Sequence, residues 1–177
     1  VAIVRATTAA DLRRLATKAS LRLDSTQIRQ ILGALSQRDD PTARVSYDRP
    51  TFSSCHPDVT IDGNTASIKR GVRKEGTAMC KEQMSCDVSH KFYAEFTLVK
   101  GVNCTVGVVR SDFDTKSTKL ACSTPDGWGY YARMGSCHHN KPRAQGSWVG
   151  QKSSREGDTI GLLLDPSRGT LSVFLNG

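Results

Sequence analysis

Apolar and polar positions alternate in short runs after residue 44. In the segment 91–99, KFYAEFTLV, apolar residues recur at every second position. Alternation of this kind predicts a β-strand. One face of the strand carries Phe92, Ala94, Phe96 and Leu98, and the opposite face carries Tyr93, Glu95 and Thr97.

Further segments have the composition of strands. VTIDGNTASI, 59–68, predicts a hairpin, because a turn around Gly63 joins two β-branched arms. CTVGVVR, 104–110, is nearly all apolar, which is typical of a strand buried on both faces. The segments TIGLLLD, 159–165, and TLSVFLNG, 170–177, complete the set. Many short strands with glycine-rich turns and no alternating helices predict a mainly β fold, an antiparallel β-sandwich.

The first forty residues follow a helical period instead. Thr8, with Asp11 three residues later, resembles the capping box that starts a helix. Apolar residues then recur at three-and-four spacing: Leu12, Leu15, Ala16, Ala19 and Leu23, followed by Ile28, Ile31, Leu32 and Leu35. A DNA-reading helix-turn-helix would need a third packing helix and a basic recognition face, and neither is evident. We therefore expect a helical N-terminal extension (1–40), a linker (41–45) and a sandwich (46–177).

The net charge of the chain is +8, from 25 Lys and Arg against 17 Asp and Glu. These charges are mostly dispersed, which favours a mildly basic solvated surface over a nucleic-acid footprint. There is no apolar run of about eighteen residues that would predict a membrane span. The first residues, VAIVRATTAADLRR, also lack the pattern of a secretory signal.

Six cysteines are scattered at positions 55, 80, 86, 104, 122 and 137. A domain of this size does not need disulfides, so we expect free thiols, a cytoplasmic protein, and the nucleus as an alternative location. Zinc sites usually take ligands in pairs such as Cys-x-x-Cys. The nearest approaches here include Cys55 beside His56 and Cys137 beside His138, and adjacent strand residues point to opposite faces. We therefore expect no metal and no cofactor.

Catalytic motifs are also missing. The sequence contains no GxSxG, HExxH or GxxxxGK pattern. Asp112 and Asp114 could form the acid/base pair of a sandwich glycosidase, but the turn composition around them favours solvated loop acids. The sequence thus predicts a protein that is not an enzyme.

Aromatic residues gather in the segment 125–150. They are Trp128, Tyr130, Tyr131 and Trp148, set among glycines. Exposed Tyr, Trp and Arg are enriched at interfaces, but we interpret the two tryptophans as core anchors. The polar run HHNKPR, 138–143, is interpreted as a loop tip, where recognition residues usually lie.

The order of these motifs resembles the SPRY domain, called B30.2 in its extended form. The motifs are GWGYYA at 127–132, GSWVG at 146–150 and GDTIGLLLDPSRGTLSVFLNG at 157–177. Upstream, CHPDVTIDGNTASIKRG and KFYAEFTLVKGVNCTVGVVRSDFD are similar to the family's opening strands and central pair. The resemblance covers residues 46–177 and implies a bent β-sandwich of lectin-like topology without catalytic residues.

The resemblance also implies a binding surface formed by loops at one edge of the sandwich. Its candidate contact residues are Arg110, Asp112, Phe113, Tyr130, Tyr131, His139, Asn140, Lys141 and Arg143. The expected partner is a protein or peptide. The chain is expected to recognise it as a scaffold component or as the substrate-recognition part of a ubiquitin ligase.

Two other functions are weighed against protein binding: a lectin-like carbohydrate-binding domain and, less favoured, a nucleic-acid binder. The family pattern normally continues beyond the final Asn-Gly, so the sandwich is expected to be incomplete at its C-terminal end. The N-terminal helices match no RING, B-box or coiled coil, which weakens the expectation of a ligase role.

Overall fold

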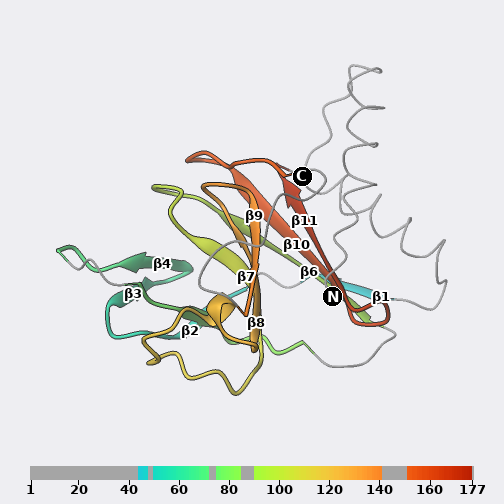
Figure 1. The fold of residues 1–177 in the computed structure, drawn as a ribbon, viewed down its shortest axis with the longest axis horizontal. Coiled ribbons are helices and arrows are strands. Elements are labelled where there is room, and N and C mark those ends of the chain that lie inside the picture. Colours follow the sequence, from blue (N-terminus) through green and yellow to red (C-terminus); the bar gives the residue numbers. More distant parts are fainter. Residues whose placement is uncertain (1–43, 48–49, 72–74, 85–89, 141–150, 177) are drawn as a thin grey trace. The chain divides into compact units, whose positions relative to one another are not determined.

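The structure, a computed structural model, describes residues 44–47, 50–71, 75–84, 90–140 and 151–176. The expected N-terminal helices, Cys86, Lys141, Arg143 and Trp148 lie outside these ranges. The described chain is mainly β, with one short 3-10 helix, and its strands fall into two compact units (Figure 1). Within these ranges no helix is long and apolar enough to cross a membrane.

The first unit contains a four-stranded sheet in the order β1-β6-β10-β11. Its strands are β1 (Arg44–Tyr47), β6 (His90–Thr97), β10 (Thr159–Asp165) and β11 (Thr170–Leu175). β1 pairs with β6 in parallel, and the other two pairings are antiparallel. The strands predicted at 91–99, 159–165 and 170–177 are confirmed, with ends within about two residues of the expected ones.

One face of this sheet is apolar. Directly opposite residues share a face, so the register groups Ile160 with Phe96 and Leu175, and Leu162 with Ala94 and Val173. Ile160 is fully buried, and Leu162 is nearly so. Alternate positions of β6, β10 and β11 therefore supply this apolar face.

The opposite face is buried as well, although its residues are largely polar. Tyr93 is 4% exposed and packs edge-on against Phe174, with ring centroids 6.2 Å apart. Its hydroxyl donates to Glu95 at 2.9 Å. A Cβ atom at Gly161 would lie 2.4 Å from the Tyr93 hydroxyl, so only glycine leaves room for this side chain across the strand pair.

A buried ion pair lies on the same face. Lys91 Nζ is 3.4 Å from Asp165 Oδ2, and the two side chains are 7% and 8% exposed. Asp165 Oδ1 also accepts hydrogen bonds from Ser167 Oγ at 2.5 Å and from the backbone N–H of Arg168 at 3.3 Å. Burial raises the pKa of the Asp165 carboxyl, but the Ser167 hydrogen bond and the Lys91 charge outweigh it, and the pKa lies below its usual value. Through these two bonds Asp165 caps the β10–β11 turn.

The second unit begins with two small ribbons. β2 (Phe52–Cys55) pairs with β5 (Ala78–Cys80), and β3 (Val59–Asp62) pairs with β4 (Thr65–Ile68). Both pairs are antiparallel. The second ribbon is the hairpin predicted at 59–68, and its turn contains Gly63 at φ +55°, a backbone conformation that favours glycine.

The second unit also holds the sheet that carries most candidate residues. β7 (Thr105–Val109), β8 (Gly127–Tyr131) and β9 (Ser136–His139) form an antiparallel sheet in that order. The 3-10 helix η1 (Ala121–Ser123) lies against β8. Their contact is so close that a Cβ atom at Gly127 would meet the Ala121 carbonyl group. The prediction that β7 is buried on both faces is wrong. Its residues are half-buried or exposed, because β7 is an edge strand of this sheet.

Candidate functional site

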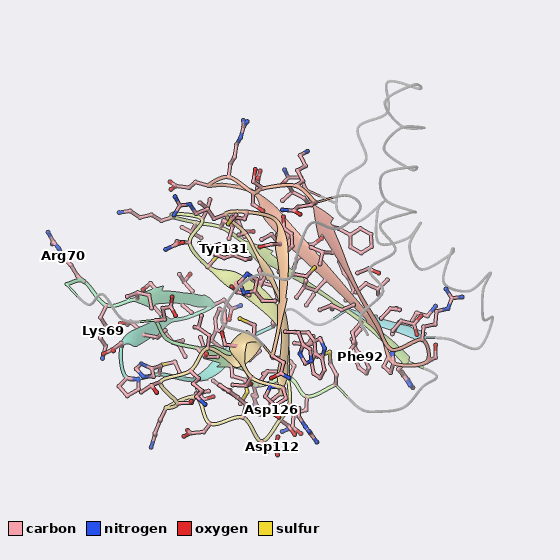
Figure 2. The ribbon with its side chains drawn as sticks, in the orientation of Figure 1. Lys69, Arg70, Phe92, Asp112, Asp126 and Tyr131 are labelled. Atoms are coloured by element: carbon pink, nitrogen blue, oxygen red, sulfur yellow. The ribbon has the colours of Figure 1, made fainter. Side chains whose placement is uncertain are left out.

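The strand register places the candidate residues at two opposite ends of the β7-β8-β9 sheet. Val109 lies opposite Gly127, and Trp128 opposite His139, so β7 and β9 end where β8 begins. We call this end, with the loop 110–126 and Asn140, the Arg110 end. Figure 2 shows Asp112 and Asp126 at this end of the sheet and Tyr131 at the other.

An exposed ion pair closes the Arg110 end. The backbone N–H of Arg110 donates to the carbonyl oxygen of Asp126 at 2.9 Å, and Arg110 Nη1 is 3.8 Å from Asp126 Oδ1. The two side chains are 65% and 39% exposed. An ion pair this exposed contributes about 0 to 1 kcal/mol to stability. Because both side chains are exposed and their mutual attraction is weak, both charged groups remain accessible to a ligand.

The loop that follows Arg110 is shaped by its own hydrogen bonds. The N–H of Phe113 donates to the Arg110 carbonyl oxygen at 3.1 Å, and Asp114 Oδ1 accepts the N–H of Lys116 at 2.9 Å. This second bond is an Asx turn, which gives Asp114 a structural role. Asp112 is exposed and Phe113 is half-buried. The loop therefore presents Asp112 beside Arg110 and keeps part of the Phe113 ring accessible.

A flat aromatic pair lies at the same end of the sheet. The rings of Trp128 and His139 stack with centroids 4.5 Å apart and 6° between their planes. His139 Nδ1 donates to the Gly127 carbonyl oxygen at 2.9 Å, which assigns the proton of a neutral ring to Nδ1. The pair therefore has a fixed orientation, and Trp128 is half-buried where a core anchor was expected.

The polar run after β8 is not wholly a loop tip. His138 and His139 are half-buried residues of β9, so the loop prediction is wrong for both. They belong to the strand because their backbone pairs with β8, opposite Gly129 and Trp128. Asn140 is exposed, has φ +52° and donates its N–H to the Thr124 carbonyl oxygen at 3.2 Å. It ends β9 and ties this strand to the segment that precedes β8.

The two candidate tyrosines lie apart from this loop. Tyr130 is 2% exposed, and its hydroxyl donates to the Lys152 carbonyl oxygen and lies 3.3 Å from Ser154 Oγ. A side chain this buried offers no contact area to a partner. Tyr131 lies at the opposite end of β8, where its hydroxyl donates to Asn103 Oδ1. Burial lowers the pKa of His138, whose ring packs edge-on against Tyr131 at 5.5 Å.

The thiols in the described ranges are unbridged, and four of them are less acidic than an ordinary cysteine. Cys55, Cys80, Cys104, Cys122 and Cys137 are free. Burial, with a smaller effect of the Glu82 carboxylate, raises the pKa of Cys80 to about 11. Burial also raises the pKa values of Cys104, Cys122 and Cys137. A protonated thiol is a poor nucleophile and metal ligand. Among the described residues, no cluster of three or more His, Cys, Asp or Glu could hold a metal ion.

Two residues of the Arg110 end were not singled out from the sequence as contacts. Asp126 precedes Gly127, and an Asp-Gly pair signals a turn, which would have placed this carboxylate in a loop. Trp128 was assigned to the core on residue type alone. Its pairing with His139 depends on the β8–β9 register, which no local pattern specifies.

Comparison with protein families gives a match. The model of the SPRY domain family matches residues 89–177, which is half of the chain. This span includes β6 to β11 and the whole Arg110 end. No curated protein matches the chain.

Proposed function

The chain belongs to the SPRY domain family, and we propose that it recognises a protein or peptide partner through the Arg110 end of the β7-β8-β9 sheet. SPRY domains are generally non-catalytic protein-interaction modules. The mainly β, antiparallel architecture is consistent with the β-sandwich of this family.

The observation that carries the proposal is the exposed Arg110–Asp126 pair on a loop whose backbone is already ordered. A guanidinium offers donors in a fixed fork that fits a carboxylate, and Asp126 accepts from backbone or lysine N–H groups. The internal bonds of Phe113 and Asp114 reduce the conformational entropy that the loop would lose on binding. A preordered loop with both charges accessible suits a partner segment that carries charges of both signs.

The aromatic pair adds contact area next to these charges. The Trp128 and His139 rings are held parallel, and Phe113 is partly accessible in the neighbouring loop. Rigid aromatic side chains give large contact area at a low cost in conformational entropy. Apolar side chains of the partner would pack near these rings while its polar groups reach Arg110 and Asp126.

The same geometry favours protein binding over the two other functions. His139 covers one face of the Trp128 indole, which leaves that face closed to a sugar ring. The Arg110 end also carries Asp112, Asp114 and Asp126, which offset its basic residues and so weaken the attraction of a phosphate backbone. We assign the chain a role as a scaffold or substrate-recognition component in the cytoplasm or nucleus, without a catalytic step of its own.

Affinity capture from lysate tests the proposal. The bait is the full chain, compared with the Arg110→Glu and Phe113→Ala variants and with Lys69→Glu as a matched control. Lys69 is exposed and follows the separate β3–β4 hairpin (Figure 2). Partners retained by wild type and Lys69→Glu but lost by both loop variants support the proposal. Equal retention by all four baits contradicts it.

A further inference from the structure

The opposite end of the β7-β8-β9 sheet carries a second exposed surface. It consists of Asn103, the turn 131–135 and the segment 151–153, and we call it the Tyr131 end. Met134 is 58% exposed at the tip of the turn, beside exposed Arg133. Tyr131 and His138 are half-buried next to it. Exposed Met and Arg beside Tyr are residue types enriched at protein interfaces.

This surface is held rigidly. The N–H groups of Met134 and Gly135 donate to the Tyr131 carbonyl oxygen at 3.3 and 2.8 Å, and Gln151 Nε2 donates to the Met134 carbonyl oxygen at 2.9 Å. Gly135 has φ +66°, and a Cβ atom there would lie 2.2 Å from the Lys152 carbonyl oxygen. The turn is therefore in close contact with the segment 151–153, and Met134 is exposed on a fixed backbone.

The charge of the Tyr131 end has one sign. The sequence contains no Asp or Glu between residues 127 and 155. Arg133 and Lys152 are both exposed, and neither forms an ion pair with any described residue. The Arg110 end, by contrast, combines basic residues with three aspartates. A partner of the Tyr131 end would meet uncompensated positive charge around an apolar side chain.

We infer that the Tyr131 end is a second interaction surface, which binds an acidic peptide segment that carries an apolar side chain. The thioether of Met134 is flexible and polarisable, so it adapts to apolar side chains of different shape. Arg133 and Lys152 attract carboxylates that flank this side chain. The two ends of the sheet therefore have different charge patterns and suit different segments, which would let one domain hold two chains or two parts of one chain.

Fluorescence anisotropy with the full chain tests this inference. The probe is a labelled peptide in which a central leucine is flanked by glutamates. Binding is expected to weaken when NaCl is raised from about 50 to about 300 mM, because salt screens the attraction. The double variant Arg133→Glu/Lys152→Glu is expected to lose about tenfold or more in affinity, and Met134→Ala about threefold to tenfold.

Two controls keep the result specific. Lys69→Glu, which reverses an exposed charge elsewhere, should bind the probe as wild type does, apart from a small effect of net charge. Unfolding midpoints within about 2 °C of wild type would show that the variants fold, since all the altered side chains are exposed. If Lys69→Glu lost as much affinity for the probe as the double variant, the effect would come from the overall charge of the chain, and the inference would be overturned.

Other occupants of this surface give different outcomes. Equal binding of a peptide with serine in place of leucine, or of a single-stranded oligonucleotide, would make the surface a general anion patch and contradict the proposed partner. Self-association in sedimentation experiments that Met134→Ala abolishes would assign the surface to a second copy of the chain, and would also contradict it. Failure of wild type to bind the probe overturns the inference without affecting the Arg110 end.

Discussion

The imidazole of His139 lies flat on the indole of Trp128, 4.5 Å away between centroids. The two residues face each other across the β8–β9 pair, and the bond from His139 Nδ1 to the Gly127 carbonyl oxygen fixes the imidazole. The stack therefore couples the start of β8 to the end of β9, immediately before Asn140. Both residues lie at the Arg110 end of the sheet.

Replacing His139 should weaken both the sheet and the binding site. His139→Ala removes the stack and the hydrogen bond, and we expect a loss of about 1 to 2 kcal/mol in unfolding free energy. His139→Phe keeps a ring against Trp128 and should recover part of this loss. Urea denaturation followed by tryptophan fluorescence measures both variants. Equal stability of His139→Ala and wild type would show that the stack carries no free energy.

The Lys91–Asp165 pair should make stability depend on acid pH. The native pKa of Asp165 lies below the unfolded value of about 3.9, so the ionised carboxylate stabilises the fold above that value. This contribution is lost as pH falls through the native pKa. Ser167→Ala removes a hydrogen bond that lowers the pKa, so its unfolding free energy should change less between about pH 5 and 2 than that of wild type. Parallel curves for the two proteins would contradict the assignment.

Removing one charge of this pair should cost far more than removing the hydroxyl of Ser167. Asp165→Asn leaves the Lys91 ammonium buried without its counter-charge, with an expected loss of about 3 to 5 kcal/mol at neutral pH. Lys91→Met combined with Asp165→Asn should regain much of this loss, because no buried charge remains. A double variant no more stable than Asp165→Asn would contradict the buried-charge explanation.

Gly161 should tolerate a methyl group only when Tyr93 is shortened. Gly161→Ala places its Cβ against the Tyr93 hydroxyl and ring, and we expect a loss of about 1 to 3 kcal/mol. The same change in a Tyr93→Phe background should cost less, because the nearest clashing atom is gone. A double-mutant cycle by thermal unfolding measures the difference. Additive losses would show that the two residues do not compete for this space.

The local sequence patterns predicted the positions of the strands better than they predicted which side chains of each strand are buried. Alternation predicted β6, apolar composition predicted β10 and β11, and the β3–β4 hairpin followed from its turn residues. The burial of Lys91 could not be read from alternation, because it depends on Asp165 in a strand far along the chain. Residue type alone marks a lysine as exposed.

For the candidate binding residues too, the local sequence did not predict which side chains are buried or lie together. Arg110, Asp112 and Phe113 were candidates because of the family resemblance, and the structure gathers them with Asn140 at one end of the sheet. Tyr130 and Tyr131 are neighbours in sequence, yet they point to opposite faces of β8, and only Tyr130 is buried. Which face is covered depends on the segment 151–154, whose contact with β8 has no local sequence signal.

The central claim is that Arg110 and its neighbours form the partner-binding surface. Isothermal titration of the captured partner against wild type, Arg110→Glu and Lys69→Glu tests it most directly. We expect Arg110→Glu to weaken binding by about tenfold or more, corresponding to at least about 1.4 kcal/mol, while Lys69→Glu binds as wild type does. Wild-type affinity in Arg110→Glu would place the partner elsewhere on the domain and contradict the claim.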